Sequence, residues 1–249
     1  MLADTVGQEL AFYPERHTVG QQLASCPVVE ASHVWRSYHR GAETIHALAD
    51  MSLTVQPGEM VGIVGRSGSG KTTFLNQVGC LDTPTEGSIR ICGTEVTGMK
   101  ERELVAFRRD HIGFIFQLFY LIPTLTAVEN VELPLIFARE ENRRPRAMEA
   151  LTRVGLKEFD ALPHQLNGGD MQRVAVARAL VRKPKLLLAD EPTGRLEHRS
   201  REAIMDIFRG LQAEGMGVIL VTHDPTLAAE TDRIVELRDG RVVEAVPVG

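Results

Sequence analysis

The eight residues 65–72 carry the strongest chemical signal in this sequence: Gly65, Arg66, Ser67, Gly68, Ser69, Gly70, Lys71 and Thr72. Their spacing fits G-x-x-x-x-G-K-[ST], with an apolar run before the segment and a helical pattern after it. Glycines let successive backbone N–H groups turn toward phosphate oxygens, and a helix N-terminus adds partial positive charge. We expect Lys71 to reach the β- and γ-phosphates, Thr72 to ligate Mg²⁺, and Thr73 to lie in the same site. A chance glycine-rich turn would rarely combine all these features, so the segment predicts a nucleoside triphosphate site.

Two carboxylates, Asp190 and Glu191, directly follow the apolar run at residues 186–189. Parallel sheets bind ligands at the carboxyl ends of their strands, so Asp190 should emerge beside the glycine-rich loop. Asp190 can hold Mg²⁺, usually through its water shell, and Glu191 can orient and deprotonate the attacking water. A solvated acidic pair at a strand end is the ordinary alternative, and the upstream loop favours the catalytic interpretation.

Two more polar residues follow apolar runs in the same way. His223 comes after residues 218–221, and Gln117 comes after residues 112–116. A lone histidine is more often structural, but at a second strand end it can reach the γ-phosphate and the water. Gln117 either caps its strand or uses its amide to contact Mg²⁺ or water. We interpret both residues as catalytic, with Gln117 also contacting the metal.

These side chains need a largely parallel sheet to bring them together. Apolar runs at 60–64, 112–116, 186–189 and 218–221 alternate with helical patterns at 71–79, 169–182 and 201–211, which predicts an α/β core. Shorter strand-like runs lie at 28–31, 34–35, 53–55 and 88–91, and a hairpin is expected around Asp239-Gly240. A helical subdomain is predicted within 118–165, and Gly155 is a plausible end for one of its helices. The prediction rests on apolar residues at helical spacing, namely Val128, Val131, Leu135, Met148, Leu151 and Val154.

Composition excludes several classes of protein. The net charge of −5 and pI of about 5.9 argue against nucleic acid as a partner, because phosphate binding usually leaves a basic footprint. Cys26, Cys80 and Cys92 form neither a disulfide framework nor a metal-binding spacing, which fits a reducing cytoplasm. No apolar run approaches the roughly 18 residues of a membrane span, so another chain would have to cross any membrane involved. Residues 1–27 are interpreted as an N-terminal extension.

The segment 166–180 narrows the class of protein further. It begins Leu-Asn-Gly-Gly-Asp-Met-Gln-Arg and, with the glycine-rich loop and the Asp-Glu-Pro-Thr-Gly run at 190–194, closely resembles the nucleotide-binding subunit of ABC transporters over about residues 28–245. The resemblance implies a P-loop NTPase (RecA-like) core with a mainly parallel sheet, an antiparallel β subdomain and an inserted α-helical subdomain. The ATP-binding domain would span 28–249, with core and β subdomain at 28–117 and 166–249 and helices at 118–165. It also implies an ATPase that uses ATP and Mg²⁺.

The resemblance further implies a head-to-tail homodimer with two ATP molecules at the interface. Each ATP would meet the glycine-rich loop of one copy and Asn167, Gly168 and Gly169 of the other, with Tyr38 stacked on adenine. Residues 79–87, 112–117 and 133–135 look like the branch of lipoprotein-releasing and macrolide-exporter ATPases. That branch implies a membrane-spanning permease on a separate chain, with this subunit at the cytoplasmic face of the membrane.

Four positions depart from the pattern of that family. Asn167 stands where serine is usual, Asp170 replaces Gln or Glu, Arg195 occupies a usually small or polar position, and Glu197 stands where Asp is usual. An Asn amide can donate a hydrogen bond as the serine hydroxyl does, but it is larger. We expect these changes to slow hydrolysis while ATP binding persists.

Other functions use a similar ATP site. A non-transport ABC ATPase that regulates cell-envelope or division enzymes would share every residue above. ABC ATPases of DNA repair carry long coiled-coil insertions and those of translation carry two tandem units, neither of which is present here. A small-molecule kinase would leave the segment 166–180 unexplained. The sequence therefore favours a transport ATPase and names no substrate.

Overall fold

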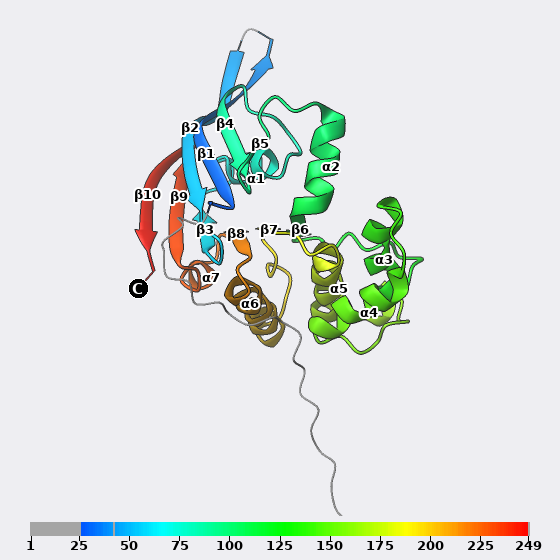
Figure 1. The fold of residues 1–249 in the computed structure, drawn as a ribbon. Coiled ribbons are helices and arrows are strands. Elements are labelled where there is room, and N and C mark those ends of the chain that lie inside the picture. The colour runs from blue at the N-terminus through cyan, green and yellow to red at the C-terminus, as the bar shows by residue number, and fades with distance from the viewer. Residues whose placement is uncertain (1–25, 42, 249) are drawn as a thin grey trace, which may run out of the picture.

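The structure, a computed structural model, describes residues 26–41 and 43–248, and it contains two sheets (Figure 1). The interpretation of residues 1–27 as an extension therefore lies almost wholly outside the described residues. The larger sheet has six strands in the order β10 (Arg241–Pro247), β9 (Arg233–Arg238), β3 (Met60–Val64), β8 (Gly217–Val221), β7 (Leu186–Asp190) and β6 (Ile112–Phe116). Only the β10–β9 pair is antiparallel among them. This is the mainly parallel core that the alternating pattern predicted.

The smaller sheet is antiparallel and lies above the core in Figure 1. Its order is β2 (Glu43–Val55), β1 (Val29–Arg40), β4 (Glu86–Ile91) and β5 (Thr94–Glu95). The strands β1 and β2 are much longer than the short runs predicted at 28–35 and 53–55. Antiparallel backbone pairing extends β1 to Arg40 and begins β2 at Glu43. The sequence does not show an apolar alternation where the two strands approach their connecting turn, because most side chains there are exposed.

Helices cover both faces of the parallel sheet, which explains its unbroken apolar strands. Helix α1 (Lys71–Val78) lies between the two sheets, while α6 (His198–Ala213) packs on the opposite face. In β7, Leu186 and Leu188 join the core beneath the antiparallel sheet, whereas Leu187 and Ala189 join the core on the α6 side. A strand buried on both sides needs no polar alternation.

The helical region projects to one side of the sheet as α3 (Ala127–Phe137) and α4 (Arg143–Arg153). Both pack against α5 (Gly168–Leu180), which also contacts β6. The predicted apolar positions of α3 are buried, and Gly155 follows α4 with a φ of 76°. In α4, the predicted apolar position Leu151 is buried, whereas Met148 is 38% exposed.

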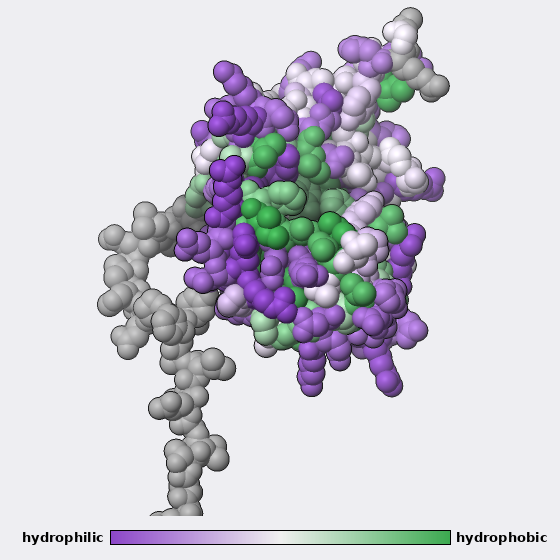
Figure 2. Space-filling view, turned by 90° about the vertical axis from the view of Figure 1, so that its right-hand side faces the viewer, coloured by the Kyte–Doolittle hydropathy of each residue, from purple (hydrophilic) through white to green (hydrophobic). Residues whose placement is uncertain are grey.

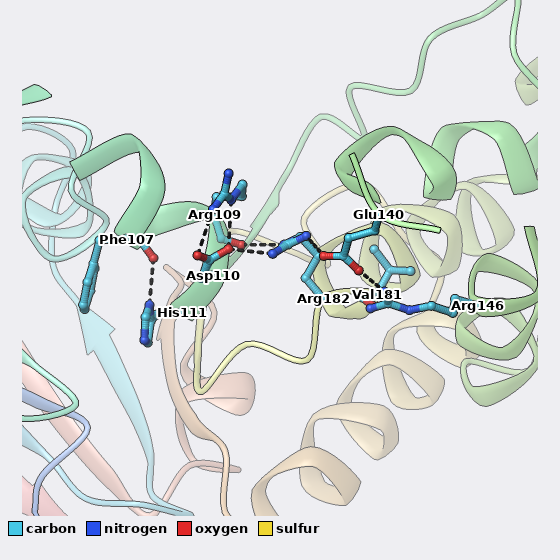
Figure 3. A network of polar contacts seen from close by, with 8 residues as sticks. All are labelled: Phe107, Arg109, Asp110, His111, Glu140, Arg146, Val181 and Arg182. Carbon is cyan, nitrogen blue, oxygen red and sulfur yellow. Dashed lines mark hydrogen bonds and ion pairs between the residues drawn. The ribbon is translucent and has the colours of Figure 1, made fainter. Parts of the chain in front are cut away.

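A chain of ion pairs joins the helical region to the core (Figure 3). The guanidinium of Arg182, just after α5, lies 2.6 Å from Asp110 in α2 (Glu101–His111) and also contacts Glu140, which follows α3. Arg146 of α4 contacts the same Glu140. One largely buried guanidinium thus bridges two carboxylates from different elements, a geometry that suits arginine better than lysine.

Helix α2 was not predicted from the sequence. It buries only Leu104 among its residues, so its apolar periodicity is weak. A turn of 3₁₀ helix at Pro163–Gln165 and the short helix α7 (Pro225–Ala228) complete the fold. None of the helices in the described part of the chain combines the length and apolar character that crossing a bilayer requires.

Candidate active site

The glycine-rich loop connects the end of β3 to the start of α1, where the motif predicted it. Gly65 and Gly70 have φ values of 152° and 103°, which side chains rarely allow. A Cβ at Gly65 would lie 2.3 Å from the carbonyl oxygen of Leu237, and one at Gly70 would lie 2.6 Å from that of Ala47. Glycine at both positions is therefore required by backbone conformation and by close packing.

A cavity of about 380 Å³ opens over this loop. Three strand-end residues and one residue of β2 join the loop in lining it: Ala47, Gly65, Ser67, Gly68, Gly70, Lys71, Thr72, Thr73, Asp190, Glu191 and His223. Ala47 was missed in the sequence, because nothing in an alanine within a strand indicates contact with Gly70. Arg66 and Ser69, although part of the motif, instead line a neighbouring cavity toward the turn between β9 and β10.

The ammonium of Lys71 sits in the mouth of the loop. Its Nζ donates to the carbonyl oxygens of Gly65 at 2.8 Å and Arg66 at 2.9 Å. These acceptors hold the cation at the loop, and a glycine-rich loop of this kind turns its backbone N–H groups toward phosphate oxygens. The arrangement concentrates positive charge at the position that a phosphate group would occupy.

Thr72 and Asp190 meet at the carboxyl end of β7. The Thr72 hydroxyl donates to Oδ2 of Asp190 at 3.4 Å. Burial raises the pKa of Asp190, the nearby charge of Glu191 raises it further, and the Thr72 hydrogen bond and Lys71 oppose the shift. A half-buried carboxylate whose charged form is disfavoured, next to a hydroxyl oxygen, suits a hard divalent cation such as Mg²⁺.

Glu191 and His223 form a second polar pair at the same sheet edge. Nδ1 of His223 lies 2.7 Å from Oε1 of Glu191, and the glutamate side chain is 19% exposed. Glu191 has a φ of 49°, and its backbone N–H donates to the carbonyl of Val221 at 2.9 Å. A non-glycine residue held in this conformation is strained, which is common where a side chain must be aimed. The pair can orient a water molecule beside the cavity.

Gln117 and Tyr38 do not line the cavity. The Gln117 side chain is exposed and packs on Gly194, where a Cβ would lie 2.8 Å from its Nε2. The Tyr38 hydroxyl donates to Asp82 at 3.1 Å, and the guanidinium of Arg36 lies 4.6 Å from the centre of the Tyr38 ring. Arg36 covers one face of this ring, and 42% of the residue remains exposed.

Asn167, Gly168 and Gly169 also lie outside the cavity, at the N-terminus of α5. Asn167 is the N-cap residue, and its side chain accepts a hydrogen bond from the Asp170 N–H. Gly169 packs so closely on the first turn of α6 that a Cβ would lie 2.5 Å from the Ser200 hydroxyl. The N-termini of α1 and α5 are therefore separate in this structure, and the first N–H groups of each helix have no partner within the helix.

Gln172 of α5 is a further polar residue that sequence reasoning missed. It is fully buried, and its Nε2 donates to the carbonyl oxygen of Pro192, directly after Glu191, at 2.6 Å. No signal in the sequence marks it, because Gln172 stands beside Arg173 in the polar first half of α5. This contact ties the helix that begins at Asn167 to the segment that carries Glu191.

A glycine-rich loop between a parallel strand and a helix, with Lys71, Thr72 and Asp190 converging on it, defines a P-loop nucleoside triphosphatase. Comparison with known proteins refines this class. The family model described as ABC transporter matches residues 48–194. An uncharacterised ABC transporter ATP-binding protein of Bacillus subtilis (strain 168), YknY, is 48% identical over 221 residues, which cover 88% of this chain and 96% of that protein.

Two further comparisons agree with this result. The macrolide export ATP-binding/permease protein MacB of Rhodopseudomonas palustris (strain HaA2) is 49% identical over 218 residues, covering 86% of this chain and 33% of MacB. The dimeric structure of the ABC transporter cassette MJ0796 superposes on this chain with a TM-score of 0.82 and 45% sequence identity, covering 89% of this chain and 99% of the MJ0796 chain. A second MJ0796 structure, of a post-hydrolysis state, contains ADP and Pi. The chain belongs to the ABC transporter family. It is an ATPase subunit of the kind that binds and hydrolyses MgATP to power a transporter and acts as a dimer.

Proposed function

We propose that each ATP site of the dimer is built from two copies of this chain. One copy supplies the glycine-rich loop with Asp190 and Glu191, and the other supplies Asn167, Gly168 and Gly169. The observation that carries the proposal is that the N-terminus of α1 opens into the cavity, whereas Asn167, Gly168 and Gly169 at the N-terminus of α5 lie outside it, and helix N-termini favour anions. A head-to-tail dimer brings the second N-terminus over the first, and the similar cassette MJ0796 is dimeric.

The side chains divide the work within this composite site. Lys71 binds the β- and γ-phosphates, and Thr72 and Asp190 hold Mg²⁺ directly or through water. Gln117, which packs on Gly194 outside the cavity, would contact the metal through water. The metal supplies positive charge that offsets the charge of the phosphates when it is bound. Glu191 accepts a proton from the attacking water. His223, whose Nδ1 lies 2.7 Å from Oε1 of Glu191, orients the glutamate and the water.

The adenine ring would stack on Tyr38. Arg36 covers one face of the Tyr38 ring, so adenine would stack on the opposite face. The hydrogen bond from the Tyr38 hydroxyl to Asp82 holds the ring in one orientation. Tyr38→Ala should raise the KM for ATP with little change in kcat, because stacking stabilises the bound substrate and the transition state alike. An equal KM in the two proteins would remove Tyr38 from the site.

The membrane partner would dock in an apolar groove between α2 and α3. The groove has a volume of about 530 Å³, and its lining includes Leu81, Val105, Phe114, Pro134 and Phe137. Leu81, Val105 and Phe137 are 48%, 45% and 78% exposed, and Figure 2 shows a hydrophobic hollow on this side of the molecule. Contiguous exposed apolar side chains of this kind mark interaction sites.

This groove supports a membrane-spanning permease on a separate chain as the partner, with the subunit held at the cytoplasmic face of the membrane. The similarity to MacB, whose printed name joins an ATP-binding part to a permease, favours that kind of partner. Next to the groove, Leu118, Tyr120 and Ile122 are also exposed and extend the apolar surface.

The experiment co-expresses the chain with the membrane protein encoded beside it and measures co-purification and ATPase rate. Phe137→Asp and Leu81→Asp should each abolish co-purification while the isolated chain keeps its ATPase rate. The matched control is Val243→Asp, which changes an apolar residue that is 49% exposed on β10, outside the groove. Equal co-purification of all three variants would place the partner elsewhere.

A further inference from the structure

Asn167 and Asp170, two of the positions that depart from the usual family pattern, are bonded to each other. Oδ1 of Asn167 accepts from the backbone N–H of Asp170 at 2.9 Å, and Nδ2 of Asn167 donates to Oδ2 of Asp170 at 2.6 Å. Both ends of the planar amide are therefore held by the same residue. We call this reciprocal contact the Asn167–Asp170 clamp.

Among the residues that the structure describes, the clamp leaves one donor of the amide unused. A side-chain amide carries two N–H groups on Nδ2, and Asp170 accepts from only one of them. Because the amide plane is fixed at both ends, the direction of the second N–H is fixed as well. The Asp170 carboxylate is itself positioned, since its Oδ1 lies 3.9 Å from Nε of Arg173 one turn along α5.

We propose that Asp170 is a positioning residue, which orients Asn167 so that its second N–H donates to the terminal phosphate of a nucleoside triphosphate bound by the other copy of the chain. The inference rests on the composite site proposed above. An asparagine that is free to rotate would lose side-chain rotamer entropy when it binds the phosphate. The clamp already restricts the Asn167 side chain in the monomer, so less entropy is lost when the dimer closes. A serine hydroxyl is shorter and rotates freely, so it needs no such partner.

The carboxylate of Asp170 also has an opposing effect. A negative charge near the phosphate would repel it, although the hydrogen bond that the carboxylate accepts from Asn167 and the nearby Arg173 reduce that effect. The benefit of Asp170 therefore depends on Asn167. With serine at position 167, only the repulsion would remain, and removal of the carboxylate should cost nothing.

The test is a double-mutant cycle in a Glu191→Gln parent, which binds MgATP but hydrolyses it slowly. Sedimentation velocity would give the dissociation constant of the MgATP-bound dimer for Asp170→Ala, Asn167→Ser and the double variant. Losing one ordered hydrogen bond costs about fivefold in affinity, and the change occurs at both sites, so Asp170→Ala should raise that constant about 25-fold. In the Asn167→Ser background, the same substitution should change it less than about threefold, or tighten the dimer.

Two variants control the interpretation. Asp170→Asn keeps an oxygen that can accept from Asn167, so it should stay within about threefold of the parent. Glu149→Gln removes an exposed carboxylate of α4 away from α5's N-terminus and should have no effect. Thermal unfolding of each monomer checks that the variant is folded. Asp170→Ala keeps the backbone N–H that donates to Asn167, so this variant retains the cap of α5.

The outcomes separate the two proposals. If Asp170→Ala weakens the dimer equally with Asn167 and with serine at that position, the clamp is wrong although the composite site stands. If the parent binds MgATP and stays monomeric, the composite site is wrong and the clamp with it. A 25-fold effect that disappears in the serine background, with rescue by Asp170→Asn, supports the clamp.

Discussion

The buried amides of Gln172 and Gln77 should respond in opposite ways to the same substitution. Gln172 in α5 is fully buried and donates to the Pro192 carbonyl at 2.6 Å. Gln77 in α1 is 1% exposed, and neither of its amide atoms has a hydrogen-bond partner within residues 26–41 and 43–248. Methionine is close to glutamine in shape and removes both polar atoms, so Gln→Met at each position isolates the polar contribution.

The expected free energies follow from these contacts. Gln172→Met leaves the buried Pro192 carbonyl without its donor, which costs about 1–3 kcal/mol. Oε1 of Gln172 has no partner in the described part of the chain, so its removal offsets part of that cost, leaving a loss of about 1–2 kcal/mol. Gln77→Met removes two unpartnered polar atoms and should stabilise the fold by about 1 kcal/mol. The two variants should therefore differ by about 2–3 kcal/mol in unfolding free energy.

Urea unfolding of the two variants and the wild type measures this difference, and steady-state ATPase assays add a functional readout. Because Pro192 directly follows Glu191, Gln172→Met should lower kcat while the KM for ATP changes little. Gln77→Met should leave kcat within about twofold of the wild type, because only the loop-facing residues of α1 line the cavity. Unfolding free energies within about 0.5 kcal/mol of each other would refute the assignment of the Gln172 hydrogen bond as stabilising.

Three further predictions follow from the site and the ion pairs. Gly65→Ala should abolish ATP binding and lower the unfolding midpoint, measured by calorimetry, because its Cβ would lie 2.3 Å from a backbone oxygen. His223→Ala should lower kcat about 100-fold while ATP binding, measured with a fluorescent analogue, is kept. Arg109 and Arg182 lower the pKa of Asp110 from 3.8 to about 2. The ionised carboxylate therefore stabilises the fold fully above about pH 4, and this stabilisation is lost as the pH falls through about 2. Wild type should therefore unfold at a higher temperature than Asp110→Asn at pH 6, and this advantage should disappear near pH 2.

The sequence predicted the elements whose pattern comes from burial on both sides. The strands β3 and β6 have the predicted bounds, because every residue of such a strand contacts the interior and the apolar run is continuous. Helix α2 and the far ends of β1 and β2 escaped prediction because few of their residues face a core. Their positions come from tertiary packing and strand pairing, which a local pattern does not carry.

The site divides in a similar way. The glycine-rich loop could be predicted because its phosphate-binding geometry lies within one short segment. The contact of Ala47 with Gly70 and the bond from Gln172 to Pro192 join segments far apart in the chain, so the sequence alone did not reveal them. The substitutions Asn167 and Asp170 were visible in the sequence as separate departures, and only the structure shows that they contact each other.

The most direct test of the account is the mass of Glu191→Gln with and without MgATP, measured by sedimentation velocity together with bound-nucleotide content. The composite site predicts a monomer without nucleotide and a dimer holding two ATP molecules with MgATP, and Lys71→Ala in the same background should stay monomeric. A Glu191→Gln protein that binds one ATP per chain and remains a monomer at all protein concentrations would contradict it.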